Sequence, residues 1–336
     1  MSLAGQVAHL VLRRLVQLIW VLPATALAAF LLLALSPIDP IDAYIDQAVA
    51  RLGEEQRALI AARWGFDQPV WQQALTWLGR IATGDFGWSS VFNAPVAAVI
   101  VERAGTSLSL MAGAFVVSGL IGFSLGLAAG TYPGSWLDRA IVFYALTLAS
   151  APTFWIALVL IAVVGVELGW APTCCALPLG VLREEATLAD RLSHLALPMV
   201  TLAVLGVAQV TLHTRARQVE VMESDYARLS LAHGDPRWRV GLTHGVKNAA
   251  LPAIVLHAAH LGELFGGSIL AEQAFAYPGL GQATVLAGLR GDAPLLLAIA
   301  LVAVLLVFLG NLIADVLHRL IDPRYQEMGH QEREGA

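Results

Sequence analysis

Charged side chains are scarce in this sequence, and its positive charge comes almost entirely from one residue type. Only 13% of the 336 residues are Asp, Glu, Lys or Arg, about half of the roughly 25% found in soluble domains. Lysine occurs once, as Lys247, so nearly all basic residues are Arg. The net charge of −5 provides no basic footprint for nucleic acid. We therefore exclude nucleic acid as a partner and do not expect a soluble fold.

Cysteine and the common sequence patterns of catalysis are also missing. The sequence holds two cysteines, Cys174 and Cys175, and because adjacent cysteines rarely bond to each other they make no disulfide framework. The phosphate-binding pattern G-x-x-x-x-G-K-[ST] is absent, as are G-x-S-x-G, H-E-x-x-H and C-x-x-C. We expect no enzymatic activity, cofactor or metal ion in this chain, so its energy must come from a partner.

Long apolar runs dominate what is present. Apolar residues make up 57% of the sequence, and several runs reach the ~20 residues needed to cross the hydrocarbon core of a membrane. The first run has no small-residue cleavage site before Ser36, so it is expected to be a retained span. We predict an all-α, polytopic membrane protein with six transmembrane helices. They are expected at residues 15–38, about 107–129, within 140–166, about 195–213, about 248–271 and 293–314.

Basic residues orient the chain in the membrane. Arg13 and Arg14 precede the first span, so the positive-inside rule places the N-terminus in the cytoplasm. Six spans then put both termini on that side. The expected parts are residues 1–38 with span one, a small extracytoplasmic segment at 39–103 with helices near 54–63 and 69–82, a five-span core at 104–324 containing a cytoplasmic loop at 214–248, and a polar tail at 325–336.

Glycines mark places where helices pack closely or the chain turns. Small residues in span two indicate close helix–helix packing; they are Gly113, Gly119, Gly122 and Gly126. A second group after span five indicates either a re-entrant corner at the outer mouth or a tight connection into span six; it comprises Gly266, Gly267, Pro278, Gly279 and Gly281. The isolated acids Glu272 and Asp315, at span ends, are interpreted as interfacial anchors.

The loop after span four has the pattern of a built element. Its apolar residues recur at helical spacing, as Met222, Tyr226 and Leu229. Gly234 is suited to a left-handed helix end, and Asp235 and Pro236 to the N-cap and first position of a second helix. The pattern predicts a helix, a sharp corner and another helix outside the membrane. An ordinary solvated loop is the alternative.

Six motifs, in order along nearly the whole chain, resemble one family. The segments SPIDP, WGFDQPVWQQALTWLGRIATGDFGWS, APTFW, DYARLSLAHGDPRWRVGLTHGVKNAALP, GGSILAEQAFAYPGLG and IDPR begin at residues 36, 64, 151, 225, 266 and 321. Together they resemble the membrane-spanning permease subunits of the dipeptide, oligopeptide and nickel class of ATP-binding-cassette importers. Arg228 fits the family pattern, whereas Leu229 and Ser230 fit it loosely, and Ile38 stands where Gly is usual.

The resemblance implies that the helix in the 214–248 loop is a coupling helix that docks into a separate ATPase. The residues expected to take part are Met222, Asp225, Tyr226, Arg228, Leu229, Ser230 and Gly234. An apolar stripe can be buried in the groove of a partner, and charges at its rim set register. The implied partners are a second homologous permease subunit, two cassette ATPases that carry ATP and Mg, an extracytoplasmic solute-binding protein and the lipid of a bacterial inner membrane.

Span five carries the most polar face, with His257, His260 and Glu263. Successive steps of three residues in a continuous helix spread these side chains over about 120°. Ionisable groups within a membrane usually face a cavity or the bundle interior, and in the resembled family this span lines the translocation path. Transient metal binding by the two His and the Glu, or polar packing between helices, are the alternatives.

Two other classes compete with an ATP-driven importer. A secondary transporter should carry acids in several spans, but the acids here cluster in loops. A membrane-embedded enzyme should show a catalytic constellation, and none is visible. The substrate is left open among dipeptides, oligopeptides, nickel and metal–chelate complexes, with a slight preference for metal or metallophore drawn from the histidines and the SPIDP variant.

Overall fold

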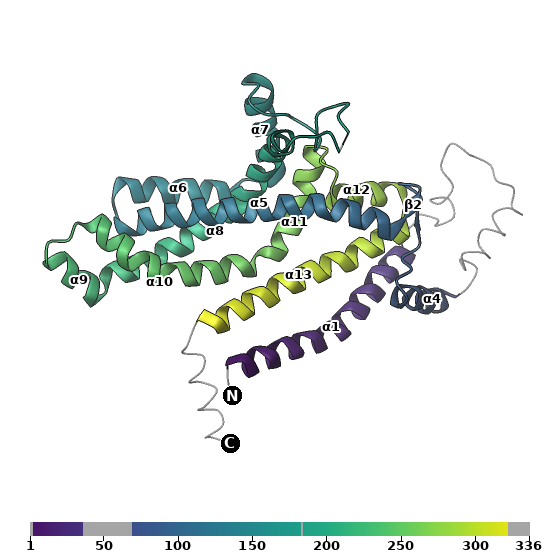
Figure 1. The fold of residues 1–336 in the computed structure, drawn as a ribbon, viewed down its shortest axis with the longest axis horizontal. Helices are drawn as coiled ribbons and strands as arrows, with labels where there is room; N and C mark the ends of the chain where they lie inside the picture. The colour runs from purple at the N-terminus through teal and green to yellow at the C-terminus, as the bar shows by residue number, and fades with distance from the viewer. Residues whose placement is uncertain (1–2, 36–68, 183, 322–336) are drawn as a thin grey trace, which may run out of the picture. The chain divides into compact units, whose positions relative to one another are not determined.

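The computed structural model describes residues 3–35, 69–182 and 184–321, and most of these are helical (Figure 1). The helices are α1 (Leu3–Ala34), α4 (Val70–Ala82), α5 (Val96–Thr131), α6 (Trp136–Ser150), α7 (Thr153–Leu160), the π-helical η2 (Ile161–Glu167), α8 (Leu188–Glu223), α9 (Asp225–Ala232), α10 (Arg237–Ala259), α11 (Leu261–Ala274), α12 (Leu280–Arg290) and α13 (Ala293–Ile321). A short antiparallel pair, β1 (Trp88–Ser89) and β2 (Ala94–Pro95), precedes α5.

The predicted all-α membrane architecture is confirmed. Four helices are long and apolar enough to cross a membrane, and two bent helix pairs raise the number of candidate spans to six if each pair counts as one. The expected helix at 69–82 is present as α4. The helix expected near 54–63 and the polar tail at 325–336 lie outside the described residues.

The predicted third and fifth spans are not straight helices. The chain bends by 105° between α6 and the α7–η2 pair, and by 56° between α10 and α11. Pro152 explains the first break, because its ring disfavours helical backbone at Ala151, which is extended. Span four is longer than predicted: α8 has 36 residues, with Pro198 inside it, and measures about 54 Å at 1.5 Å per residue.

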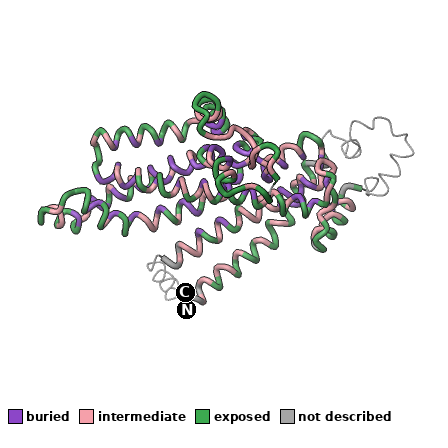
Figure 2. Tube along the Cα trace, turned by 45° about the horizontal axis from the view of Figure 1, so that its top comes forward, coloured by how far each residue is buried: buried purple, intermediate pink, exposed green. Residues whose placement is uncertain are grey.

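The chain divides into two compact units. The first comprises Met1–Leu12, Ser109–Tyr277 and Val307–Ala336, and the second comprises Arg13–Leu108 and Pro278–Leu306. In the first unit, α8 and α10 run side by side and α9 lies at their shared end (Figure 1). Buried residues line the inner helices there, whereas the tip that carries α9 is mostly exposed (Figure 2).

Glycines allow α5 and α8 to approach closely within the first unit, as predicted. A Cβ added to Gly122 would lie 2.8 Å from Val210 Cβ, and one added to Gly126 would lie 2.5 Å from Thr214 Cβ. Gly113 likewise faces the side chain of Met199. The stripe extends one step further than predicted, because a Cβ on Gly130 would meet α8 in the same way.

In the second unit a buried carboxylate ties the β1–β2 turn to the start of α13. Asp292 accepts hydrogen bonds from Ser89 Oγ (2.5 Å) and from the backbone N–H of Val91 (3.1 Å) through one oxygen, and from the backbone N–H of Leu295 (3.2 Å) through the other. Of the glycines predicted to mark a re-entrant corner or a tight connection, Gly279 precedes the short helix α12, Gly281 lies inside it, and Gly266 and Gly267 lie inside α11. Gly291, which was not part of that prediction, ends α12 in the left-handed region.

Candidate functional site

The α9 segment is a separate helix because Ser224 interrupts the chain. Its side chain accepts a hydrogen bond from the backbone N–H of Ala227 (3.4 Å) and donates one to the carbonyl of Val221 (2.5 Å). The same residue therefore ends α8 and caps α9. A serine immediately before an Asp-led helix is an N-cap signal that was overlooked in the sequence.

The corner after α9 has the predicted conformation at Gly234, whose φ is +94°. The prediction for the next helix was off by one residue. Pro236, with extended backbone, is the N-cap of α10, and the helix begins at Arg237. Asp235 lies outside the helix and approaches Arg239, with 3.7 Å between Oδ1 and Nη1.

The predicted stripe of three apolar residues on one helix is wrong. Met222 belongs to the last turn of α8, is 4% exposed, and packs in a small core with Ala227, Val240 and Leu231. Tyr226 and Leu229 lie on α9, beyond the Ser224 cap, and are 44% and 60% exposed. The core therefore holds α9 in place, while Tyr226 and Leu229 remain on the surface.

The other predicted coupling residues lie around this exposed pair. Asp225 and Arg228 are also exposed. Ser230 is half-buried, and its Oγ lies 3.3 Å from Nε2 of His244 on α10. The His244 ring is also 5.2 Å from the Tyr226 ring. His244, which sequence reasoning missed, thus joins α10 to the surface of α9.

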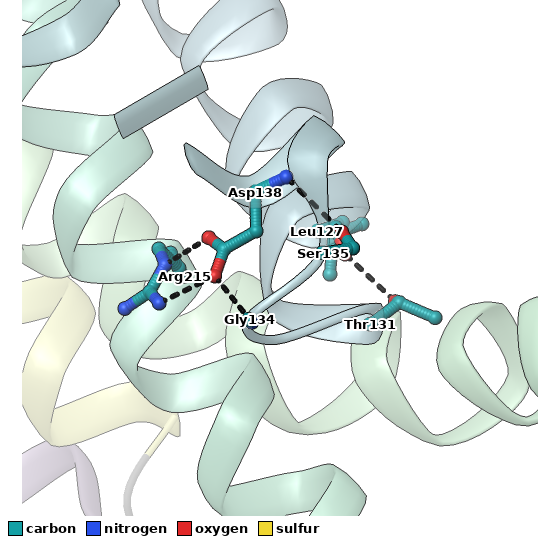
Figure 3. A network of polar contacts seen from close by, with 6 residues as sticks. All are labelled: Leu127, Thr131, Gly134, Ser135, Asp138 and Arg215. Atoms are coloured by element: carbon teal, nitrogen blue, oxygen red, sulfur yellow. Dashed lines mark hydrogen bonds and ion pairs between the residues drawn. The ribbon is translucent and has the colours of Figure 1, made fainter. Parts of the chain in front are cut away.

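An ion pair braces the helices beneath this loop (Figure 3). The carboxylate of Asp138, in the first turn of α6, accepts two hydrogen bonds from Arg215 on α8. They come from Nε to Oδ1 (2.5 Å) and from Nη2 to Oδ2 (2.7 Å). The carboxylate also accepts a hydrogen bond from the backbone N–H of Gly134 (2.8 Å). Ser135 caps α6, because its hydroxyl accepts a hydrogen bond from the backbone N–H of Asp138. This two-pronged geometry fixes α6 and α8 in orientation as well as distance.

A buried amide makes a second brace. Gln218 on α8 donates from Nε2 to Thr131 Oγ1 (3.0 Å) and to the carbonyl of Gly241 (3.1 Å). A Cβ on Gly241 would lie 2.5 Å from Thr131 Oγ1, and one on Gly245 would overlap the Gln218 amide. Arg237 Nε also donates to the carbonyl of Thr131 at 2.7 Å. The ends of α5, α8 and α10 are therefore locked together where α9 begins and ends.

The predicted loop at 214–248 is consequently more ordered than expected. Arg215 and Gln218 are helical residues of α8 that face other helices, because α8 continues to Glu223. Their partners lie 77 and 87 residues away. No sequence signal pairs residues at such a separation, although a glutamine in the continuation of an apolar helix was a hint of burial.

The polar residues predicted on span five do not share one face of a continuous helix, because the chain bends at His260. His257 is buried against α5: its ring stacks on Phe115 (centroids 4.0 Å apart), and its Nε2 lies 3.2 Å from Ser118 Oγ. Glu263 is exposed, 3.9 Å from Nε2 of His260. Among the described residues, no three His, Cys, Asp or Glu side chains are placed to hold a metal ion.

These features define a multi-pass membrane subunit with a braced, surface-exposed helix between two of its membrane helices. Residues 122–327 match the family described as "Binding-protein-dependent transport system inner membrane component". The chain belongs to this family and is therefore a transport subunit of the bacterial inner membrane.

Similar proteins cover almost the whole chain. The "Oligopeptide transport system permease protein AppB" of Bacillus subtilis (strain 168) is 33% identical over 95% of this chain and 99% of its own. The "Di/tripeptide transport system permease protein DppB" of Pseudomonas aeruginosa (strain UCBPP-PA14) is 30% identical over 93% and 97%. The structure of the MetNI methionine ABC transporter in an inward-facing conformation matches the fold with a TM-score of 0.52 and 20% identity, covering 67% of this chain and 97% of that chain.

Proposed function

We propose that this chain is the permease subunit of an ATP-driven peptide importer and that α9 couples it to a separate ATPase. The observation that carries the coupling role is the way α9 is built. A core beneath it, together with the contacts that hold α8 to α5, α6 and α10, supports a helix that nonetheless leaves Tyr226 and Leu229 uncovered. A rigid helix with exposed apolar side chains binds a partner without a large ordering cost.

The expected assembly follows from what the chain lacks. With no phosphate-binding pattern in its sequence, the ATP and Mg belong to two partner ATPases. A second homologous permease subunit would complete the translocation path, and an extracytoplasmic binding protein would deliver the substrate. Glu263 and His260, at the α10–α11 bend, are the proposed path residues, whereas buried His257 instead holds α10 against α5.

Peptide is favoured as the substrate because the similar permeases above are named for oligopeptides and for di- and tripeptides. The preference for a metal or metallophore drawn from the histidines gains no support from these names. Thermal unfolding of the cognate binding protein tests the assignment, with dipeptides, longer peptides, nickel and a nickel–chelate complex as ligands. A raised melting temperature with peptide alone is expected, and a rise with nickel or its chelate alone would overturn it.

Coupling is tested by comparing two exposed leucines, one on α9 and one in the loop that precedes α8. Leu229→Ala removes an exposed side chain (60%) from α9, and Leu179→Ala removes an even more exposed one (87%) from the loop before α8. In proteoliposomes with the ATPases and binding protein, Leu229→Ala should lower transport-coupled ATP hydrolysis by about tenfold, the effect of a ~1.4 kcal/mol contact. Leu179→Ala should have no effect.

The same assay separates the proposal from the secondary-transporter alternative. Uptake that proceeds without ATPase subunits and collapses with an ionophore would favour a secondary transporter. Equal activity of wild type, Leu229→Ala and a Tyr226→Ala variant, with normal co-purification of the ATPases, would refute the docking role of α9.

A further inference from the structure

The two cysteines have no part in the proposed coupling or transport path. Cys174 and Cys175 are free, half-buried, and lie in the loop between η2 and α8. They are also the two cysteines of the whole sequence. Any thiol chemistry of the chain is therefore confined to this one place.

The loop holds the pair in a fixed turn. Cys175 has a φ of +71°, in the left-handed region, and its backbone N–H donates to the carbonyl of Phe275 at 2.9 Å. Phe275 is buried and ends α11. On the other side, a Cβ added to Gly165 of η2 would overlap the Thr173 side chain, so no larger residue fits there. The dithiol turn is thus anchored to both η2 and the end of α11.

The two thiols are carried by adjacent residues but are poorly placed for a disulfide. A hydrogen bond with Cys174, together with partial burial, raises the pKa of the Cys175 thiol. Successive Cα atoms across a trans peptide are about 3.8 Å apart, shorter than the ~4.4–6.8 Å that disulfides require. The turn therefore favours two neighbouring free thiols over a bond between them.

We propose that Cys174 and Cys175 form a two-thiol binding site for a soft, thiophilic ion, such as Cu(I), Ag(I) or trivalent arsenic. Soft ions select sulfur ligands, and two tethered thiols bind such an ion as a chelate. Binding of a monovalent cation forms two metal–sulfur bonds and releases the two thiol protons. Chelation raises the apparent affinity about 10²–10⁴-fold over one thiol, because the second ligand is already at high effective concentration.

The position of the site adds a prediction about its side of the membrane. The dithiol turn precedes α8, and α9 follows it, so the 36-residue helix separates the two. If α9 faces the cytoplasm, as the proposed function requires, the thiols face the extracytoplasmic side. This part rests on the proposed function, whereas the chelation does not.

Phenylarsine oxide is the probe, because it reports two neighbouring thiols directly. Its As=O group reacts with both thiols, forming two As–S bonds and one water without any change in oxidation state. The full chain, purified in detergent and reduced beforehand, is titrated with the arsenical and then alkylated with a maleimide. Intact mass counts the thiols that remain free.

Wild type should lose both maleimide additions at a concentration about 100-fold lower than that which protects the remaining thiol of Cys174→Ser or Cys175→Ser. A dithiol competitor should restore alkylation, and a monothiol at equal concentration should not. Equal protection in wild type and the two serine variants would overturn the proposal, as would an unprotected wild type.

Labelling of intact cells with a membrane-impermeant maleimide locates the site independently. Labelling from outside is expected, and pre-treatment with Ag(I) should block it. Labelling only after the cells are opened would contradict the orientation and the coupling proposal together, while the chelation result would stand.

Discussion

Replacing Asp138 by Asn tests whether the brace beneath α9 is an energetically important part of the fold. The substitution keeps the shape of the side chain but removes the charge that Arg215 binds through two nitrogens. Arg215 is then left without its carboxylate partner. The backbone N–H of Gly134 also loses the negative charge on the group that accepts its hydrogen bond. A matched control lies on α8, the helix that carries Arg215. There Arg217 and Glu220 form another ion pair, with 2.7 Å between Nη1 and Oε2.

Burial determines how much each ion pair contributes to the free energy of unfolding. Breaking a fully buried ion pair costs about 3–5 kcal/mol, whereas exposed pairs contribute about 0–1 kcal/mol. The Asp138 side chain is 3% exposed and that of Arg215 is 31% exposed, so solvent screens one partner. We therefore expect a loss of about 2 kcal/mol in the free energy of unfolding for Asp138→Asn. Both partners of the control pair are more than half exposed, so Glu220→Gln should cost less than about 0.5 kcal/mol.

Thermal unfolding of the purified chain in lipid nanodiscs measures both effects. A loss of 2 kcal/mol corresponds to a fall of about 4 °C in melting temperature, taking ~2 °C per kcal/mol for a chain of this size. An Asp138→Asn, Arg215→Gln double variant should lose less than the two single variants combined, because neither charge is left unpaired. Equal melting temperatures for Asp138→Asn and Glu220→Gln would refute the reasoning.

Two further predictions concern glycines. Gly126→Ala should destabilise the chain by about 1–3 kcal/mol, because the new methyl group overpacks against α8. Gly105 lies on the same helix, but no atom lies within 4 Å of a Cβ there, so Gly105→Ala should be neutral or stabilising by about 0.5–1 kcal/mol. The melting temperatures of both variants check this, and a similar loss in both would contradict it. At the α9 corner, nothing lies within 4 Å of a Cβ on Gly234, so only its left-handed backbone conformation disfavours other residues. Gly234→Asn should therefore keep the coupled ATPase activity, whereas Gly234→Val should lose most of it, with equal amounts of both chains in the membrane. Full activity of the valine variant would show that the corner is not required.

Local signals predicted much of this architecture. Runs of apolar residues located the membrane helices, the helix predicted at 69–82 is present as α4, and Gly234 marked the corner correctly. Small residues also predicted the close approach of α5, although their partner helix could not be named. These features succeed because their cause lies within a few residues of the chain.

The failures come from contacts between distant segments and from small interruptions of a pattern. Met222 continues the apolar spacing of α9, but the Ser224 cap assigns it to another helix and buries it. Likewise, His257 and Glu263 are periodic in sequence, but the bend at His260 separates them. The Asp138–Arg215 brace depends on three-dimensional packing that periodicity does not encode.

The proline within α8 gives that helix a mechanical property. Pro198 has no N–H to donate to the carbonyl one turn before it, which weakens the helix at this turn. From Pro198 to Glu223 the helix runs about 38 Å at 1.5 Å per residue. Used as a lever pivoting at the proline, such an arm converts a rotation of about 10° into a displacement of about 6–7 Å at α9, more than one helical turn. A modest swing at the pivot would thus be magnified at the tip.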